Sequence, residues 1–502
     1  MSFNELLPLL VIASSLLPGL IIFMLPEERV LLRSVLNLLG AVVKLALIGL
    51  LLAGVVAGEE FGLRYGLAPG LELVFKADAL ALLFVGLSAT LWLFTTLYAI
   101  GYLEHAPYRS RFFGFFSLCV TATMGIAMAG NLLTFFIFYE LLTLATFPLI
   151  VHRGTPQAMR GGTVYLAYTL LGGALLLIGM VWLNQLAGQL DFAQGGVLAA
   201  LEGLPQDQLK LIFLLLIVGV GVKAAMVPLH GWLPKAMVAP APVSALLHAV
   251  AVGKAGAFGV VRIVYEIYGI EFAQSLGLLL PLAVAAAVTI LWGSLRALFQ
   301  EELKKRLAFS TVSQVSYILL GVGIFGMAGT VGGLVHLVHQ GIMKITLFFC
   351  AGNYAETLGI HRVDELDGAG RRMPLTSAAF SIGALGMMGA PLTAGAISKT
   401  WLKAGALAAQ MPWAIWVLTA SSLLNMAYFL PILYRLWLKP LPVSWPHEEI
   451  PARKWRETHL LLLVPPLVTA GATVAAYLFS EAGFSPLAFA RMIMGLEYHT
   501  PP

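Results

Sequence analysis

The sequence predicts an all-α polytopic membrane protein with about fourteen transmembrane helices. Of its 502 residues 59% are hydrophobic and 11% are charged, whereas soluble domains carry about 25% charged residues. Long apolar runs follow one another along the whole chain, and most reach the roughly 20 residues that a helix needs to cross a bilayer. A soluble fold of this length would divide into domains joined by polar linkers, and the sequence shows no such linker.

Short loops separate the predicted spans. Turn residues mark several joints, such as Gly130-Asn131, Pro240 and Gly326. Boundaries inferred from a sequence carry an error of several residues. The predicted spans cover residues 4–25, 32–57, 78–100, 112–129, 132–150, 161–187, 210–234, 241–267, 274–298, 305–326, 329–355, 374–404, 411–438 and 458–481.

Lysine and arginine in the loops predict the orientation, because short cytoplasmic loops carry an excess of both. The odd-numbered loops and their edges hold Arg29, Arg33, Arg109, Arg111, Arg153, Arg160, Lys235, Arg296, Lys304, Lys305, Arg306, Arg362, Arg371, Arg372, Arg435, Lys439, Arg453, Lys454 and Arg456. The even-numbered loops hold Arg64, Lys76, Lys210 and Lys403. We therefore expect a protein of the inner (plasma) membrane, with both termini outside the cytoplasm. The net charge of +5 then reflects topology and does not indicate a nucleic-acid partner.

Two predicted spans are interrupted by proline and glycine. Span seven reads GVGVKAAMVPLHGWLPKAM and span twelve reads ALGMMGAPLTAGAISKTWL. Proline removes a backbone donor, which a bilayer tolerates only where protein or water satisfies the freed groups. Each interrupted span carries a lysine, Lys223 or Lys399. Two such spans five apart indicate an internal repeat of about five helices, and transporters often bind their substrate at such breaks.

Ionisable side chains at membrane depth are the candidates for function. A charge at the bilayer centre costs about 2.5–3.5 kcal/mol on insertion scales, so several together would cost an amount on the order of a whole folding free energy. We expect these side chains to line an interior or a hydrated path. They are Lys44, Glu140, Lys223, His230, His248, Lys254, Arg262, His336, His339, Lys344 and Lys399.

Proton transfer gives a physical reason for these residue types. Burial disfavours the charged form of a lysine, and a nearby carboxylate favours it. Glu140 is the one acid that we place deep in a span, so its distance from Lys223 is expected to control proton release. Histidine exchanges protons near neutral pH. The predicted proton pathway comprises Glu140, Lys223, His230, His248, Lys254, His336, His339, Lys344 and Lys399.

Structural roles are the alternative at each of these positions. Glu140 could belong to a buried ion pair between helices, and each histidine could simply be hydrogen-bonded in the interior. Lys44 and Arg262 fit a structural role better than a functional one. Lys44 is expected near lipid with its amine extended toward the interface, and Arg262 lies near a span end, where it can act as an anchor.

Other chemistry finds no support in the sequence. It contains no GxxxxGK[ST] loop, no convincing dinucleotide-binding unit and no CxxC pair. Cys119 and Cys350 lie inside apolar runs and are expected to be small core residues. We therefore expect no cofactor, no metal and no catalytic redox site in this chain.

Four segments resemble the antiporter-like membrane subunits of respiratory complex I, membrane-bound hydrogenases and Mrp-type antiporters. The first, KAAMVPLHGWLPKAMVAPAPVSALLHAVAVGKAGAFGVVR, covers residues 223–262. The others are KKRLAFSTVSQVSYILLG (304–321), HLVHQGIMKITLFFCAG (336–352) and DELDGAGRRMPLTSAAFSIGALGMMGAPLTAGAISK (364–399). The resemblance extends over most of residues 75–435.

The resemblance implies fourteen helices with two inverted five-helix repeats and broken helices seven and twelve. It divides the chain into residues 1–111, the two repeats at 112–267 and 268–438, and a last helix with its tail at 439–502. It also implies a central hydrophilic axis of Glu140 paired with Lys223, then Lys254, His336 and the terminal Lys399.

The resemblance is strongest to the D subunit of Mrp-type sodium/proton antiporters, because Lys399 stands where one complex I chain has a glutamate. His339 is one position off a histidine of the longest complex I chain, and Gln340 stands in its register. We expect partner membrane subunits, the lipid bilayer, and protons and Na⁺ as the ions. The alternatives are a proton-pumping chain of complex I (NADH-quinone oxidoreductase) or a hydrogenase, and a subunit that energises inorganic carbon uptake.

Overall fold

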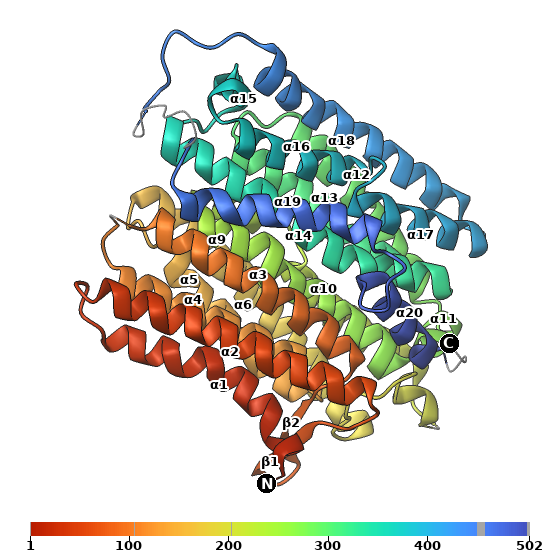
Figure 1. Cartoon of the computed structure of the whole chain (residues 1–502). Coiled ribbons are helices and arrows are strands. Elements are labelled where there is room, and N and C mark those ends of the chain that lie inside the picture. Colours follow the sequence, from red (N-terminus) through yellow and green to blue (C-terminus); the bar gives the residue numbers. More distant parts are fainter. Residues whose placement is uncertain (1, 105, 202, 449–456, 499–502) are drawn as a thin grey trace.

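The computed structural model describes residues 2–104, 106–201, 203–448 and 457–498, which form a bundle of long, roughly parallel helices (Figure 1). The elements of the first half are α1 (Phe3–Met24), α2 (Val30–Val56), β1 (Gly62–Ala68), β2 (Leu71–Lys76), α3 (Ala79–Tyr102), α4 (Arg109–Ala127), α5 (Leu132–Ile150), α6 (Pro156–Ala187), η1 (Leu198–Ala200), α7 (Gln206–Lys223), α8 (Trp232–Lys235), η2 (Ala236–Val238), α9 (Ala241–Ala245), η3 (Leu246–Val250), α10 (Val252–Arg262) and η4 (Ile263–Tyr268). Those of the second half are α11 (Ile270–Ser275), α12 (Leu279–Leu298), α13 (Leu303–Gly323), α14 (Met327–Leu358), η5 (Val363–Leu366), α15 (Ala369–Arg372), α16 (Pro374–Met388), α17 (Ala394–Ala408), α18 (Pro412–Leu438), α19 (Leu460–Leu478) and α20 (Pro486–Glu497).

Eleven helices within the described residues are long and apolar enough to cross a membrane. Each coincides with a predicted span. The other three predicted spans fall on α7, on α13 and on the pair α16 and α17, which are shorter or more polar. The all-α polytopic class is confirmed, whereas the count of fourteen, the inverted repeats and the domain boundaries stay predictions.

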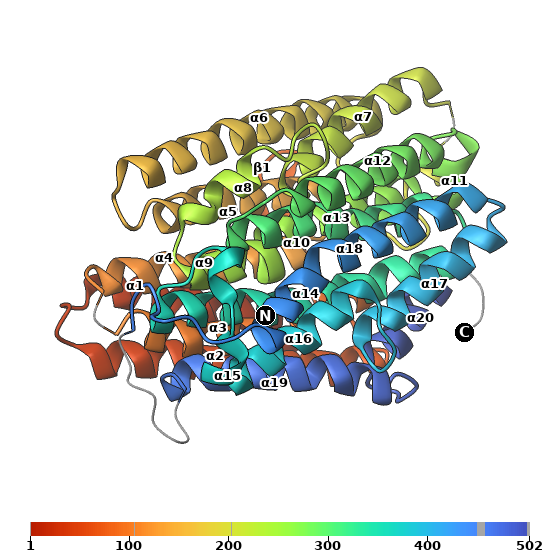
Figure 2. The same ribbon diagram turned by 90° about the horizontal axis from the view of Figure 1, so that it is seen from above.

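The helices lie in layers, and in the view of Figure 1 most of the second half of the chain lies above the first half. Seen from above, α6 and α7 run along one edge, α12 and α13 lie next inward, and α1, α2 and α19 lie on the far side (Figure 2). The long α14 sits in the interior, where it packs against α13, α17 and α19. α19 also packs against α3, so the end of the chain ties the second half to the first.

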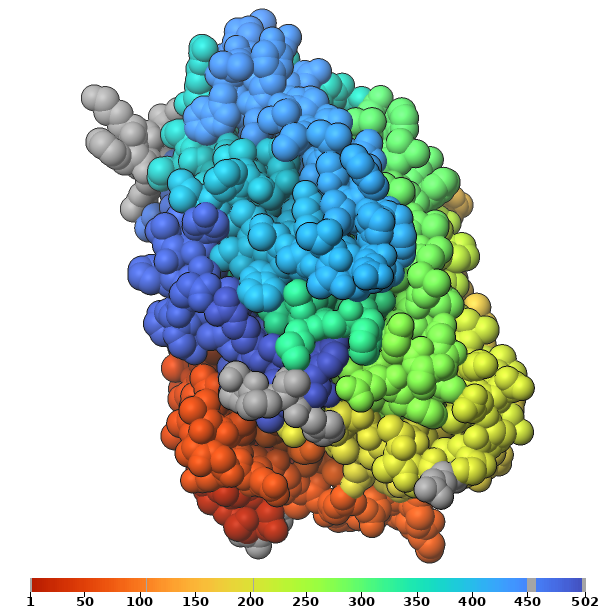
Figure 3. Space-filling model, turned by 90° about the vertical axis from the view of Figure 1, so that its right-hand side faces the viewer, coloured from red at the N-terminus to blue at the C-terminus, as the bar shows by residue number. Residues whose placement is uncertain are grey.

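The exterior of the bundle is apolar and suits lipid. Helix α18 lies in the upper part of the face shown in Figure 3, and its Trp416 and Leu423 are 73% and 61% exposed. Lysines, histidines and glutamines instead occur among the fully buried residues. This distribution is expected when the surrounding solvent is hydrocarbon, because charged groups then avoid the outside.

Both predicted interruptions are present. α7 ends at Lys223, and the chain does not resume a helix until Trp232. α16 ends at Met388 and α17 begins at Ala394, with Gly389 and Leu392 in left-handed conformations. A third interruption was not predicted. Span eight is π-helical over η3 and η4, and Ala251 breaks it between η3 and α10.

The loop between α2 and α3 forms a β-hairpin that was not predicted from the sequence. β1 and β2 pair antiparallel around a turn at Gly70. The hairpin is tied to the bundle because the amide of Gly130 donates to the carbonyl of Val74 over 2.7 Å. A short strand pair is a weak signal in a chain dominated by apolar helices, since neither strand exceeds seven residues.

Arg262 is the centre of a buried charge cluster, so its interpretation as an anchor at the membrane surface is wrong. Its guanidinium donates to both carboxylate oxygens of Asp78, over 2.8 and 3.0 Å, and also to Glu266. A fourth bond reaches the carbonyl of Ala127. The cluster joins the start of α3, the end of α4 and the end of α10. Glu140 is therefore not the one acid at depth.

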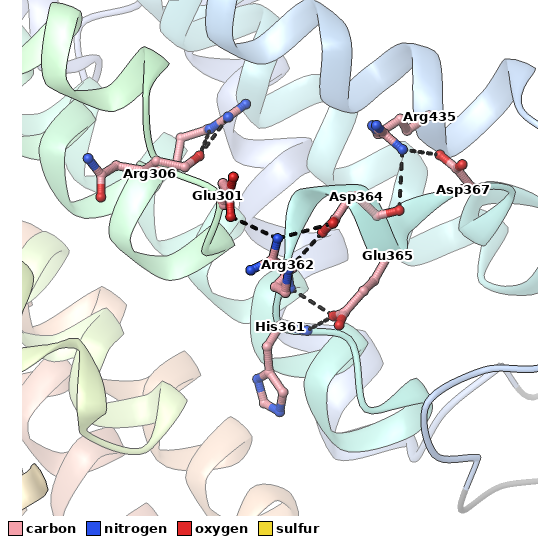
Figure 4. A network of polar contacts seen from close by, with 9 residues as sticks. Glu301, Arg306, His361, Arg362, Asp364, Glu365, Asp367 and Arg435 are labelled. Atoms are coloured by element: carbon pink, nitrogen blue, oxygen red, sulfur yellow. Dashed lines mark hydrogen bonds and ion pairs between the residues drawn. The ribbon is translucent and has the colours of Figure 1, made fainter.

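A polar network in the second half joins the loop before α13, the segment around η5 and the end of α18 (Figure 4). Arg362 donates to Glu301 over 2.8 Å and to Asp364 over 3.0 Å, and Arg435 donates to Asp367. The hydrogen bonds from Arg362 hold the pKa of Asp364 below its usual range. These arginines, used above as orientation signals, thus also fix loop geometry. Arg453, Lys454 and Arg456 lie outside the described residues.

Replacing Arg262 tests how much the fold depends on this cluster. Arg262→Met leaves Asp78 and Glu266 buried without their partner, which typically costs about 3–5 kcal/mol. We expect a clear fall in the thermal unfolding midpoint of the purified protein.

Arg64→Met is the matched control. Arg64 pairs with Asp191 and Glu72 on the surface and is 59% exposed, and exposed pairs contribute about 0–1 kcal/mol. Equal midpoints for the two variants would show that the Arg262 cluster does not stabilise the fold.

Candidate functional site

A line of buried amines runs through the interior of the bundle. Lys223 and Lys254 of this line are fully buried, Lys399 is 6% exposed, and Lys344 on a side branch is also fully buried. Each amine donates to a backbone carbonyl of another helix segment, and among the described residues none forms an ion pair with a carboxylate. A buried ammonium group needs such donors satisfied, because an unpaired charge in a low-dielectric interior is costly.

The first-half site joins α5, α6 and the end of α7. Lys223 is the last residue of α7, and its amine donates to the carbonyl of Tyr139 and lies 3.3 Å from the centre of the Tyr139 ring. Glu140 is the next residue of α5, so the predicted pair is brought together without a direct ion pair between them. The Glu140 carboxylate lies against Gly173 of α6, where any side chain would collide with it.

Lys254 connects the two halves. It lies on α10, three residues after the interruption at Ala251, and its amine donates to the carbonyl of Leu337 on α14 over 2.6 Å. Gly256, half a turn further on, contacts the backbone of Lys223 and Ala224. The close approach of α10 to the end of α7 therefore requires glycine at this position.

The second-half site combines α13, α14 and α17. His336 comes directly before Leu337, and its Nδ1 lies 2.8 Å from the hydroxyl of Ser398. The residue after Ser398 is Lys399, whose amine donates to the carbonyls of Met387 and Met388 over 2.8 and 3.1 Å. These are the last carbonyls of α16, which the interruption leaves without helical partners.

Tyr317 of α13 links His336 to Lys399, and it was not singled out from the sequence. Its ring stacks on the His336 ring with centres 5.1 Å apart, and the Lys399 amine lies 5.4 Å from the tyrosine ring centre. An aromatic in an apolar span gives no signal of its own. Its neighbours Gln314 and Ser316 could have marked α13 as an interior helix.

A side branch contains His248, Lys344 and Lys304. His248 stacks on Phe348 with ring centres 4.4 Å apart. Lys344 donates to the carbonyl of Leu307 and to the hydroxyl of Ser310. Lys304 is partly buried, and its amine donates to the carbonyl of Ala239 over 2.6 Å. From the sequence, Lys304 was interpreted only as a loop charge.

The structure places His339, His230 and Lys44, the remaining candidates, in three different surroundings. His339 is buried, and neither of its ring nitrogens has a hydrogen-bond partner among the described residues. His230 lies in the interruption after α7, where its Nε2 accepts from Trp292 of α12, a residue 43% exposed. His230 is thus placed near the exterior, away from the amines of Lys223, Lys254 and Lys399. Lys44 is fully buried, so its expected position near lipid is wrong.

Metal chemistry gains no support from the arrangement. Across the residues that the structure describes, no group of three or more His, Cys, Asp or Glu is placed to hold a metal ion.

Comparison with known proteins identifies the family. Residues 129–425 match the family described as "NADH:quinone oxidoreductase/Mrp antiporter, TM". The chain belongs to this family. The matched segment contains every residue of the central line, from Glu140 to Lys399.

The relatives include both a subunit of NADH-quinone oxidoreductase and a subunit of a cation/proton antiporter. NADH-quinone oxidoreductase subunit N of Desulforudis audaxviator is 35% identical over 428 residues, which are 82% of this chain and 83% of the relative. The A/B component of a probable K⁺/H⁺ antiporter of Rhizobium meliloti is 28% identical over 79% of this chain and 40% of the relative. A chain in the structure of the Mrp complex from Dietzia sp. DQ12-45-1b matches over 100% of this chain and 98% of its own length, with a TM-score of 0.87 at 24% identity.

Gly256→Ala tests the close approach that places Lys254 beside Lys223. The added methyl group would meet backbone rather than a flexible side chain, and overpacking of this kind costs about 1–3 kcal/mol. We expect a lower thermal midpoint. Gly86→Ala on α3 is the control, since nothing lies within 4 Å of its added methyl group. A Gly256→Ala midpoint at or above that of Gly86→Ala would contradict the proposed packing.

Proposed function

We propose that this chain is the proton-translocating, antiporter-like subunit of a multisubunit cation/proton antiporter. The proposal rests on the line of buried amines, which passes through both halves of the bundle. Among the described residues, none of these amines forms an ion pair with a carboxylate. A carbonyl dipole holds an ammonium group less firmly than a carboxylate does, so such amines can gain and lose protons.

The order of the line follows from its contacts. The Lys223 amine donates to the carbonyl of Tyr139, the residue before Glu140. The Lys254 amine donates to the carbonyl of Leu337, the residue after His336. The His336 ring is hydrogen-bonded to Ser398, the residue before Lys399. Movement of the Glu140 carboxylate toward or away from Lys223 changes the electrostatic energy of the ammonium form by several kcal/mol at an effective dielectric of about 20. The resulting change in the charge of Lys223 then alters the protonation of Lys254, and through Lys254 that of His336 and Lys399.

The side branch supplies a route from the loop end of α13. Lys304 lies at that end, and His248 and Lys344 lie in the interior between it and the central line. On the predicted orientation this end faces the cytoplasm, and both termini lie outside in the plasma membrane. The branch would therefore admit protons from the cytoplasm.

Partner subunits follow from the composition of related assemblies. The Mrp complex of Dietzia matches this fold, and the exposed apolar face of α18 offers surface for membrane subunits as well as lipid. Na⁺ as the exchanged cation rests on the resemblance described above.

A redox-driven proton pump is the second candidate, because the Desulforudis relative is named as a subunit of NADH-quinone oxidoreductase. In that case other subunits would carry the redox centres. The genes beside this one separate the candidates: small membrane proteins alone favour the antiporter, and iron–sulfur or nickel subunits favour the redox complex.

Three alanine variants test the proton line in inverted vesicles that contain the complete complex. Glu140→Ala, Lys223→Ala and Lys399→Ala each remove one proton-binding group, so each should abolish ion-driven pH change while the complex still assembles. Lys210→Ala, near the start of α7 with a side chain 45% exposed, should keep the wild-type rate. Full activity in all three line variants would refute the proposal.

The same vesicles identify the driving force. An antiporter responds to added Na⁺ or K⁺ with no electron donor present. A response to NADH or another donor, with none to either cation, would favour the redox complex.

A further inference from the structure

The first three helices and α4 contain a second line of polar contacts, separate from the central amines. At its inner end is Lys44, fifteenth of the 27 residues of α2 and fully buried. At 1.5 Å per residue it lies about 20 Å from either end of the helix. Its amine donates to the carbonyl of Val11 over 2.5 Å and to the hydroxyl of Ser15 over 3.0 Å. The ring centre of Trp92 lies 5.5 Å away.

Within the described part of the chain, no carboxylate neutralises this amine. The ionisable residues of the helices packed against α2 are Glu5 on α1, Tyr98 and Tyr102 on α3, and Arg109, Arg111 and Cys119 on α4; α2 itself adds Arg33. None of these described residues forms a hydrogen bond or ion pair with Lys44. A lysine at such depth costs about 2.5–3.5 kcal/mol on insertion scales, and an apolar residue would pack there without that cost.

A chain of hydrogen bonds leads from Lys44 toward the loop between α1 and α2. Ser15 lies 2.9 Å from the hydroxyl of Thr121, which donates to the carbonyl of Ser117 over 2.9 Å. The Ser117 hydroxyl donates to Asn37 over 3.2 Å, and the Asn37 amide donates to the carbonyl of Arg33 over 3.0 Å.

The outer end of this chain reaches solvent. The Arg33 guanidinium donates to Ser110 over 2.5 Å and lies 4.0 Å from a carboxylate oxygen of Glu27. Glu27 is 42% exposed, and it accepts from the amides of Arg109 and Ser110 at the start of α4. The polar line thus joins an exposed carboxylate to an amine in the middle of the bundle.

We propose that Lys44 is a second proton-binding site, reached from the Glu27 edge along this line. The inference goes beyond the central pathway but rests on the proposed function, in that the bound proton takes part in translocation. Two links pass through the backbone of Arg33 and Ser117, so proton transfer along this line requires water molecules beside these polar groups. Ser15 and the Val11 carbonyl hold the protonated amine.

Trp92 provides a direct readout of the Lys44 charge, because a charge near an indole changes its resonance. The complete complex is labelled with 5-fluorotryptophan, and the ¹⁹F signal of Trp92 is assigned from Trp92→Phe. We expect this signal to titrate once across the pH range in which the complex stays intact. The titration should vanish in both Lys44→Met and Lys44→Arg, while the signal of the distant Trp437 serves as the internal control.

The arginine variant separates a proton site from a structural cation. Arginine keeps the charge and the donors but does not release its proton. A proton site predicts that Lys44→Met and Lys44→Arg both slow proton movement in vesicles at least about tenfold, with assembly and thermal midpoint of Lys44→Arg near wild type. A structural cation predicts that Lys44→Arg retains the wild-type rate.

The outcomes distinguish this inference from the proposed function. A Trp92 signal that does not titrate, or that titrates unchanged in Lys44→Arg, overturns the Lys44 site. So does wild-type transport in Lys44→Arg. Absence of proton movement in the wild-type complex overturns the proposed function instead, and the ¹⁹F titration still decides whether Lys44 binds a proton.

Discussion

A lysine amine held by a backbone carbonyl, with no fixed carboxylate partner among the described residues, is the interaction on which the functional core depends. It occurs at Lys223, Lys254 and Lys399. A salt bridge at each position would fix the proton, and an apolar residue would remove it. Carbonyl oxygens accept the hydrogen bonds of the ammonium group. The amine can still lose its proton, because no carboxylate is left without an ionic partner when the amine becomes neutral.

At Lys399 the broken helix supplies the acceptors for this interaction, whereas Lys223 and Lys254 donate to carbonyls inside the continuous helices α5 and α14. Where α16 stops at Met388, its final carbonyls have no donors from the following turn, and Lys399 of α17 satisfies two of them. Lys223 stands at the corresponding end of α7. The interruptions are therefore not irregularities in an otherwise regular bundle. The break after α16 provides the carbonyl groups that accept from Lys399.

The fold class and most of the central line could be predicted from the sequence, since both rest on local patterns. Apolar length predicts spans, proline and glycine predict breaks, and a lysine in an apolar run is conspicuous. The Asp78–Arg262 pair could not be predicted, because its members are 184 positions apart. His230 and Lys44 were misplaced for a related reason: a sequence gives depth along a helix but not the direction in which a side chain points. Tyr317 carries no charge and so gave no signal.

Lys254 is the amine of the central line that joins the two halves, so its replacement is the strictest test of a continuous line. The most direct measurement is proton movement across proteoliposomes that contain the complete complex with Lys254→Met, compared with Lys210→Met at the exposed start of α7. If the line through both halves is continuous, Lys254→Met abolishes proton movement in an assembled complex, while Lys210→Met retains it. Wild-type proton movement by Lys254→Met would contradict a continuous line through both halves.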